Sequence, residues 1–453
     1  MSHPDIPAER LTCRNDRPLR PGSLVLYWMQ QSQRATANHA LDFAIGEANA
    51  LGLPVVVGFG LTPAYPGANA RHYQFMLEGL RETEQALRAR GIALVVRLGE
   101  PPEVALELAR AAALVVCDRG YLPVQRRWRE QVARHAPCRV VEVESDAVVP
   151  VEAVSDHVEY AARTLRPKIW RLVDRFARLP QPVPVAHPSL SGNPGGLVLS
   201  NPAALVRELG VDVSVPPVRR FRGGADEAYW RLDEFLAHRL ARYDDEPPDL
   251  TGGTVSQLAP YLHFGQISPL EILLRLPPSA AGFREQLVVR RELALNYAWF
   301  QPAAGTYASL PAWARETLAA HAADRREPQY TAEEMEQGRT ADPHWNAAMA
   351  EMRHSGYLHN HLRMYWGKQI LLWSAIPEEA FATVSRLNDR YFLDGRDPNS
   401  LASVAWLFGQ HDRPWPERPV FGKVRSMTRS GLERKTDTAA YRYHAEQVRR
   451  AET

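Results

Sequence analysis

The sequence is poor in cysteine and contains no long hydrophobic run. Its 453 residues include three cysteines, Cys13, Cys117 and Cys138, and no two of them have CxxC spacing. Neither a disulfide framework nor a metal site is therefore indicated. No apolar stretch reaches the ~18 residues of a membrane-spanning helix, and the N-terminal MSHPDIPAERLTCRNDR lacks the apolar centre of a signal peptide. We expect a soluble, cytoplasmic, globular protein without a membrane partner.

Excess charge of one sign is also lacking, because the formal net charge is only +2. The distribution of charge says more than its sum. From Arg413 onward ten Lys and Arg stand against five Asp and Glu, and seven of the eleven tryptophans lie from Trp299 onward. A basic, indole-rich C-terminal half favours contact with phosphates, although a solvated basic tail explains the final segment equally well.

Strand-like and helix-like segments alternate in the first third of the chain. Apolar runs typical of buried strands lie at 23–30, 53–60, 92–98, 113–117 and 138–143, with helical segments at 37–51, 71–90, 102–112 and 124–135. Alternation at this spacing is typical of βαβ units. It predicts an α/β domain with a doubly wound parallel sheet, Rossmann-like in architecture, over residues 20–150.

A glycine pair in the second strand tests whether this domain binds a dinucleotide. Gly58-Phe59-Gly60 begins like a GxGxxG fingerprint, but Pro63 stands where the third glycine is required. NAD binding is therefore not expected. Some other ligand at the carboxyl ends of the strands remains compatible with the pattern.

The composition changes after this domain. Residues 151–223 form a connection, within which 180–196, PQPVPVAHPSLSGNPGG, is rich in Pro, Gly and Ser as surface linkers are. Apart from a short strand-like 211–215, the remainder is helical in pattern, and we predict a mostly α-helical domain over 224–453. The helical runs are 224–243, 268–276, 283–300, 311–321, 331–337, 343–374, 378–387 and 401–408.

A charged residue falls within the apolar helical segment 351–375. Arg363 needs a carboxylate partner or an anionic ligand there, because an unpaired buried charge is costly. Asp394, in the polar segment LNDRYFLDGRDPN, is a natural partner. Trp366 and Trp373 are seven residues apart on the same helix face, and Trp345 lies upstream. This pattern indicates either a tryptophan-rich core or a chain of indoles that leads to a buried redox cofactor.

Other segments place polar groups beside apolar ones. The Gly/Thr/Ser-rich start of 251–269 is typical of a phosphate-binding loop at a helix N-terminus, or of a flexible connector. Glu292 and Asn296 share one helix face. They present a carboxyl and an amide to a ligand such as a pyrimidine, or they lie on a solvated face. Trp406, in the apolar segment ASVAWLFG, is suited to stacking on a base.

Together these segments resemble class II cyclobutane-pyrimidine-dimer photolyases, of the photolyase/cryptochrome family. The likeness rests on SLVLYWMQ, QRATANHAL, YAARTLRPKI, LAPYLHFGQIS, RREL, RMYWGKQILLW and LDGRDPN followed by VAW, in the family's order over roughly residues 22–430. It implies a monomeric, light-driven lyase that repairs pyrimidine dimers flipped out of DNA. It also implies FAD, U-shaped, in the helical domain, and leaves open an antenna chromophore, a deazaflavin or similar, in the N-terminal domain.

The resemblance also implies roles for single residues. Cofactor binding falls to Arg363 and Asp394 beside the isoalloxazine, to Asn388 at the flavin N5, to Asp397, and to a phosphate-contacting set of Tyr243, Thr254, Ser256, Gln257 and Leu258. Photoreduction of the flavin falls to Trp366, Trp345 and Trp373. The dimer is contacted by Glu292, Asn296, Met364 and Trp406.

Three departures from the family pattern bear on these roles. Pro247-Pro248 stand where Arg-Asn is usual, Ala259 replaces a serine beside the phosphate loop, and 29–34 lacks a charged Arg-Asp pair. Two alternatives stay open. A cryptochrome-like photoreceptor would keep FAD and the indoles without repair, and a (6-4) photoproduct enzyme would use a histidine acid such as His359 or His361.

Overall fold

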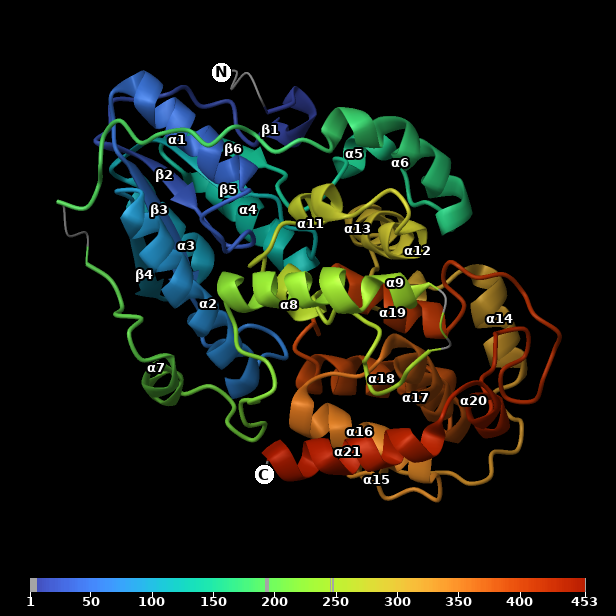
Figure 1. Ribbon diagram of the computed structural model, residues 1–453. Coiled ribbons are helices and arrows are strands. Elements are labelled where there is room, and N and C mark those ends of the chain that lie inside the picture. Colours follow the sequence, from blue (N-terminus) through green and yellow to red (C-terminus); the bar gives the residue numbers. More distant parts are fainter. Residues whose placement is uncertain (1–5, 192–194, 245, 247, 453) are drawn as a thin grey trace.

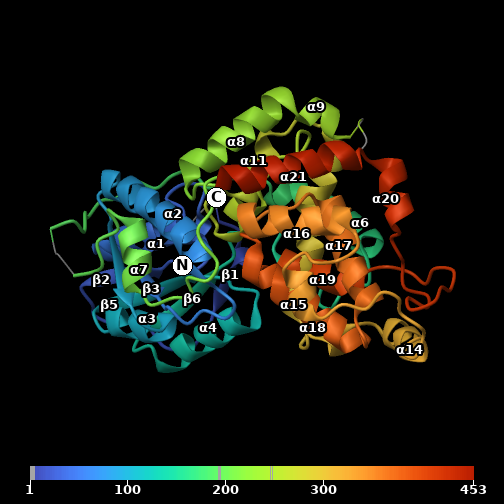
Figure 2. The ribbon, with the colours of Figure 1, turned by 90° about the horizontal axis from the view of Figure 1, so that it is seen from below.

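The computed structural model describes residues 6–191, 195–244, 246 and 248–452, as an α/β part beside a helical part (Figures 1 and 2). A six-stranded sheet with the order β1-β6-β5-β2-β3-β4 forms the α/β part. Its strands are β1 (Leu11–Cys13), β2 (Leu24–Trp28), β3 (Val55–Leu61), β4 (Ala93–Leu98), β5 (Ala112–Asp118) and β6 (Arg139–Val143). The predicted parallel, doubly wound sheet is confirmed. The sequence pattern missed β1, a three-residue edge strand antiparallel to β6, because it has no apolar run.

Helices cover both faces of this sheet. The helices α1 (His39–Leu51) and α2 (Ala70–Ala89) pack on one face, and α3 (Pro101–Ala109) and α4 (Pro123–His135) pack on the other. In β2, Tyr27 faces the α1 side and Trp28 the α3–α4 side, and both are fully buried. Because both faces are covered, the strands are continuously apolar rather than alternating.

The glycines of β3 serve helix packing. A Cβ atom on Gly60 would lie 2.5 Å from the Cα atom of Pro101, and one on Gly58 would lie 2.7 Å from a methyl carbon of Leu108. Both contacts are with α3, which therefore approaches the strand more closely than any side chain permits. This packing accounts for the two glycines without a nucleotide.

The crevice where the strand order reverses is closed by the protein's own carboxylate. Asp118, at the end of β5, accepts hydrogen bonds from the backbone N–H groups of Gln30 (3.1 Å), Gln31 (3.0 Å) and Ser32 (3.1 Å), and from the Tyr27 hydroxyl (2.6 Å). Such a cluster of amides is a common anion site in α/β folds. Here its anion is a side chain, so a phosphate has no place in it.

The helical part begins earlier than predicted. The segment 151–223, predicted as a connection, carries α5 (Val151–Val154), α6 (Ala162–Phe176) and α7 (Pro202–Glu208). The predicted strand at 211–215 is wrong, because this segment is irregular and Val215 is simply buried in the helical core. The described residues of 180–196 form no helix or strand.

The remaining helices pack into one body (Figure 2). They are α8 (Ala225–His238), α9 (Leu240–Tyr243), α10 (Ala259–His263), α11 (Pro269–Arg275), α12 (Ala281–Arg284), α13 (Arg291–Phe300), α14 (Ala312–Ala320), α15 (Ala332–Glu336), α16 (Pro343–Ser355), α17 (Asn360–Trp373), α18 (Pro377–Tyr391), α19 (Pro398–Leu407), α20 (Arg429–Lys435) and α21 (Thr438–Glu452). A π-helical segment, Glu285–Arg290, joins α12 to α13. Within the described ranges no helix is both long and apolar enough to cross a bilayer.

One predicted helix, 343–374, is two helices. Gly356 adopts the left-handed conformation (φ 70°) that commonly ends a helix, and α17 begins after His359, whose ring accepts a hydrogen bond from the backbone N–H of His361. The break lets α16 fold back and pack against α17. Trp345 of α16 thereby meets Trp366 and Trp373 of α17.

Candidate functional site

A cavity of about 760 Å³ opens in the helical part. Its walls come from α6, the π-helical segment, α13, α17, α18, α19 and the chain after α19. This volume is typical of a pocket for a cofactor or other large ligand. The predicted site residues that line it are Arg363, Met364, Trp366, Asn388, Asp394 and Trp406.

The predicted partner of Arg363 is confirmed. Arg363 and Asp394 form a bidentate pair, with Nη1–Oδ2 at 3.0 Å and Nη2–Oδ1 at 2.9 Å. The Arg363 Nε atom also donates to the Leu358 carbonyl oxygen at 3.0 Å, and the guanidinium lies 3.9 Å from the centre of the Phe392 ring. Paired and stacked in this way, the two charges are fixed in orientation at the cavity wall.

Further polar groups lie along the same wall. Asn388 of α18 is buried, and its side-chain N–H donates to a carboxylate oxygen of Asp389 at 2.9 Å, which orients the amide. Asn399 and Ser400, at the start of α19, also line the cavity. The wall therefore offers amides and a hydroxyl beside one fixed ion pair.

The three predicted indoles form a continuous path from this wall. The Trp345 indole N–H donates to the Trp366 carbonyl oxygen at 3.0 Å, and the rings of Trp345 and Trp373 are 5.3 Å apart at their centres. Tyr330, which is half-buried, lies 5.1 Å from Trp373. The Trp366 N–H meets the Met349 sulfur at 3.0 Å. Of the three indoles only Trp366 reaches the cavity.

The structure places Glu292 and Asn296 behind the cavity, against the expectation that they face a ligand. The Glu292 carboxylate accepts hydrogen bonds from the backbone N–H groups of Val148 and Val149. Asn296 accepts from the N–H of Glu159 at 2.8 Å and donates to the carbonyl oxygen of His157 at 2.9 Å. Both side chains are 2% exposed and tie α13 to the chain after the sheet. Neither lines the cavity.

Gln286 and Arg290 present the opposite face of the same helical stretch to the cavity. They lie in the π-helical segment, whose extra residue per turn shifts the helical register before α13. Ala294, one turn after Arg290 in α13, also lines the cavity, whereas Glu292 and Asn296 lie on the other face of the helix. Arginines of α6 and of the chain after α19 also border the cavity, and the sequence pattern did not single them out: Arg163, Arg166 and Arg425.

The expected phosphate loop lies outside the cavity wall. Thr254, Ser256, Gln257 and Leu258 do not line it, whereas the next residue, Ala259, does. Gln257 is held with φ 57° while its side-chain oxygen accepts from Arg231 at 2.9 Å. Of the Pro247-Pro248 pair that departs from the family pattern, Pro247 lies outside the described residues.

Two further predicted cofactor residues have structural contacts. The Tyr243 ring packs against Phe235 and Phe283, at 5.9 Å and 5.3 Å between ring centres. The Asp397 carboxylate caps α19 by accepting from the backbone N–H of Asn399 at 2.8 Å, and it accepts from or pairs with His263 at 3.1 Å. Neither residue lines the cavity.

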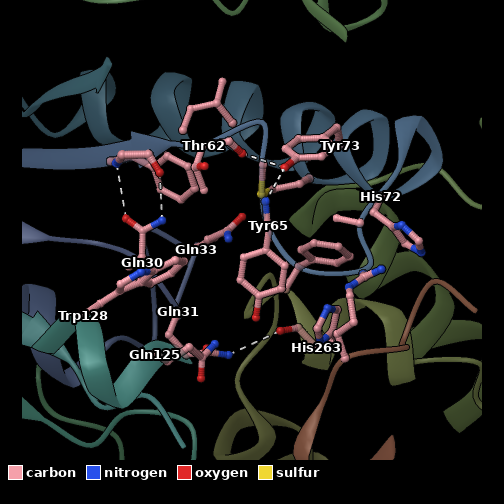
Figure 3. Close-up of a pocket in the computed structure, with 17 residues that line it drawn as sticks. Gln30, Gln31, Gln33, Thr62, Tyr65, His72, Tyr73, Gln125, Trp128 and His263 are labelled. Atoms are coloured by element: carbon pink, nitrogen blue, oxygen red, sulfur yellow. Dashed lines mark hydrogen bonds between the residues drawn. The ribbon is translucent and has the colours of Figure 1, made fainter. Parts of the chain in front are cut away.

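A second, narrow cavity of about 80 Å³ lies between the two parts (Figure 3). Gln30, Tyr65 and Trp128 come from the α/β part, and His263 comes from the helical part. Gln33 is 5% exposed, and its side-chain oxygen has no partner among the described residues. The lining thus combines aromatic rings with side-chain amides, and one of these amides has an oxygen unpaired within the described ranges.

Comparisons with known proteins identify a family and relatives to which the chain is similar. The family model described as DNA photolyase matches residues 25–188. The chain is 45% identical over 95% of its length to a deoxyribodipyrimidine photo-lyase of Methanothermobacter thermautotrophicus, covering 96% of that protein. It is 38% identical over 93% of its length to one of Oryza sativa subsp. japonica, covering 87%. The fold is similar to that of a class III photolyase from Agrobacterium tumefaciens, with TM-score 0.69, 18% identity, and coverage of 89% and 83% of the two chains.

The position of Glu292 leads to a prediction about stability. Burial raises its pKa from 4.5 to about 8, although Arg291 and the two N–H donors act in the opposite direction. The folded state thus holds an extra proton between pH about 4.5 and about 8, so the free energy of unfolding should fall across this window as pH rises. Glu292→Gln should remove that fall, on the order of a few kcal/mol, in urea denaturation at several pH values.

Glu130→Gln, on the exposed side of α4, is the matched control and should retain the wild-type profile. If the free energy of unfolding of Glu292→Gln fell with pH as steeply as that of the wild type, the proton would not belong to Glu292.

Proposed function

The chain belongs to the DNA photolyase family, and from this premise we propose that it is a class II cyclobutane-pyrimidine-dimer photolyase. The activity of the family, light-driven repair of pyrimidine dimers in DNA, is the function of this chain. One structural observation supports the specific proposal most directly. A fixed Arg363–Asp394 pair, the end of an indole path and the Trp406 ring all meet at a single cavity. We also propose that the protein acts as a monomer.

The cavity fits FAD, the cofactor of this family. Its volume is adequate for a large ligand, and the Arg363–Asp394 pair offers a fixed charge and carboxylate to a polar ring edge. Asn388, Asn399 and Ser400 would hold the remaining polar atoms. When bound, FAD supplies light absorption and one-electron transfer, while the protein supplies position and electrostatics.

The predicted phosphate-contacting residues lie next to the cavity and not in its wall. Ala259 borders the cavity directly after Gln257 and Leu258, so small movements of this loop would bring its backbone amides to a diphosphate. We retain Thr254 and Ser256 as proposed contacts on that ground. For Tyr243 and Asp397, packing and helix capping account for the side chains without a ligand.

The protein's own residues account for the remaining steps. Trp366, Trp345 and Trp373 would carry an electron from near the surface to the cavity. The acceptors of the first two indole N–H groups are a sulfur and a carbonyl oxygen. Neither acceptor is a strong base, so each indole keeps its proton as the electron passes.

Met364 and Trp406, which line the same cavity, would pack against the flipped dimer. The Gln286 amide can donate to a base carbonyl and accept from a base N–H, and Arg290 offsets negative charge that develops there. Arg163, which borders the cavity, would hold a flanking phosphate, whereas Arg166 already forms a bidentate pair with Glu285 at 3.0 Å and 2.7 Å.

The alternatives explain fewer of these features. A photoreceptor without repair has no use for Met364 and Trp406 in the cavity lining. For (6-4) chemistry, His359 is unsuited as an acid, because burial lowers its pKa to about 4 and its ring caps α17. Neither His359 nor His361 lines the cavity.

We also propose that the narrow cavity of Figure 3 is the antenna site. The free oxygen of Gln33 suits a ring N–H donor such as that of a deazaflavin, and Tyr65 and Trp128 offer ring contacts. At about 80 Å³ the cavity is smaller than typical ligand pockets, so Tyr65 or Trp128 must move for a chromophore to enter. We expect reconstitution with a deazaflavin to add an absorption band beyond those of the flavin. Gln33→Leu should prevent the appearance of this additional band. A variant that still shows the band after reconstitution would contradict the proposed antenna site.

The function is tested by light-dependent loss of dimers from an irradiated oligonucleotide. The wild-type protein, reduced beforehand, should repair in blue light and not in the dark. Trp366→Phe should lose photoreduction of the oxidised cofactor, because the indole path is cut at the cavity, yet still repair after chemical reduction. Trp230→Phe, at an exposed position of α8, should behave as wild type in both assays.

No light-dependent repair by reduced wild-type protein, with intact photoreduction, would favour the photoreceptor alternative. Normal photoreduction of the cofactor in Trp366→Phe would contradict the proposal that the electron passes through these three tryptophans.

Gln286 lines the cavity and Glu292 does not, which leads to a prediction about dimer binding. Gln286→Ala should weaken dimer binding about tenfold, because a base carbonyl or N–H loses its partner. Glu292 lies on the opposite face of the helix, so Glu292→Gln should change dimer binding at most about twofold. The glutamine side chain keeps an oxygen that accepts from the two backbone N–H groups. Electrophoretic mobility shifts in the dark measure both. The opposite ranking would return the lesion-contacting role to Glu292.

A further inference from the structure

A buried lysine lies behind the tryptophan of the cavity wall. Lys368 of α17 is 1% exposed, and its ammonium donates a hydrogen bond to the Leu407 carbonyl oxygen. Its Nζ atom lies 5.6 Å from the centre of the Trp406 ring, and the Arg425 guanidinium carbon lies 5.7 Å from that ring. Trp406 and Arg425 line the cavity, whereas Lys368 does not. The indole therefore contacts two cations, one at the cavity and one hidden from it.

The hydrogen bond from Lys368 fixes the end of α19. Leu407 is the last residue of that helix, where carbonyl groups have no partner within the helix. The backbone N–H groups that follow bond to the carbonyls of Ala405 and Trp406, so the Leu407 carbonyl is left for the lysine. A cation at a helix C-terminus also complements the helix dipole.

The two helices are in close contact at this point. A Cβ atom on Gly367 would lie 2.2 Å from a methyl carbon of Leu407. Because α17 also carries Arg363 and Met364, the lysine connects the wall that holds the ion pair to the wall that holds Trp406. Its position thereby sets the distance between two sides of one cavity.

The buried ammonium is costly, which points to a use in the site. Among the described residues no carboxylate lies within ion-pair distance of Lys368. Burial lowers its pKa to about 7; Asp412 raises it and Arg425 lowers it further, both from the chain after α19. A methionine would fill the same space without the desolvation cost. Packing alone therefore does not account for a lysine here.

We propose that Lys368 is a positioning residue for the lesion: its ammonium holds the last turn of α19 and the Trp406 ring in the orientation on which a flipped-out base stacks. The inference rests on the proposed contact between Trp406 and the dimer. A cation against an indole ring stabilises a defined ring orientation, and a fixed aromatic face is what base stacking requires.

The test compares binding of a dimer-containing and an undamaged oligonucleotide in the dark. The ratio of the two affinities should fall about tenfold in Lys368→Met and stay near the wild-type value in Lys368→Arg, which keeps the charge. Trp406→Ala supplies the second edge of a double-mutant cycle. If the lysine acts through the indole, Lys368→Met should have no further effect in the Trp406→Ala background.

The pH dependence gives an independent readout. The wild-type ratio should be highest below pH about 7 and fall as pH rises, because the ammonium loses its proton, whereas Lys368→Arg should show no such fall. His411, which lines the cavity, has its pKa lowered by burial to about 4 and does not titrate in this range. Should Lys368→Met fail to fold, as judged by its thermal melt, the arginine variant and this pH profile decide.

Two results would overturn the inference while leaving the function intact. One is a folded Lys368→Met protein whose ratio of affinities for the dimer-containing and the undamaged oligonucleotide equals that of the wild type. The other is a fall of this ratio on adding Lys368→Met to Trp406→Ala that is as large as the fall in the wild-type background. A wild-type protein with no preference for the dimer would instead refute the proposed function, and the role of Lys368 with it.

Discussion

The bidentate pair between Arg363 and Asp394 ties α17 to the loop between α18 and α19. Its two short N–O contacts hold three elements at fixed separations, and the cavity lies between those elements. Stacking of the guanidinium 3.9 Å from the Phe392 ring restricts it further. The removal of either partner would leave a part-buried charge uncompensated. The pair therefore fixes the polar part of the wall of a cavity that Trp366 and Trp406 also line.

Elsewhere in the protein, side-chain carboxyl groups are hydrogen-bonded to clusters of backbone N–H groups. Asp118 occupies an amide cluster at the switch point of the sheet, and Glu292 occupies the amides of Val148 and Val149. In each case a carboxyl group accepts hydrogen bonds from backbone N–H groups that would otherwise be open to a ligand. Asp118 does so at the carboxyl edge of the sheet, whereas the large cavity lies among the helices.

Other buried groups join the two parts of the molecule. Arg34 pairs with Asp146 at 2.8 Å, and Arg291 of α13 donates to the Asp146 carbonyl oxygen at 2.6 Å. Trp299, at the end of α13, lies 4.6 Å and 4.5 Å from the guanidinium groups of Arg119 and Arg126. One face of α13 thus carries Glu292 and Asn296 at the interface, and the other carries Leu293 and Ala294 at the cavity. Arg291 belongs to both, because it lines the cavity and bonds to Asp146.

The sequence by itself determined the βαβ alternation, the helical second half, and the pairing of Arg363 with Asp394, because each follows from local periodicity or from the need to compensate a buried charge. It also brought the three tryptophans to notice. Tertiary structure decided which side chains line the cavity. Contacts with the chain after the sheet bury Glu292 and Asn296 away from it, and the left-handed Gly356 ends α16, so that Trp345 meets Trp366 and Trp373 of α17. Both depend on contacts between distant segments or on where a helix ends, and residue spacing alone reveals neither.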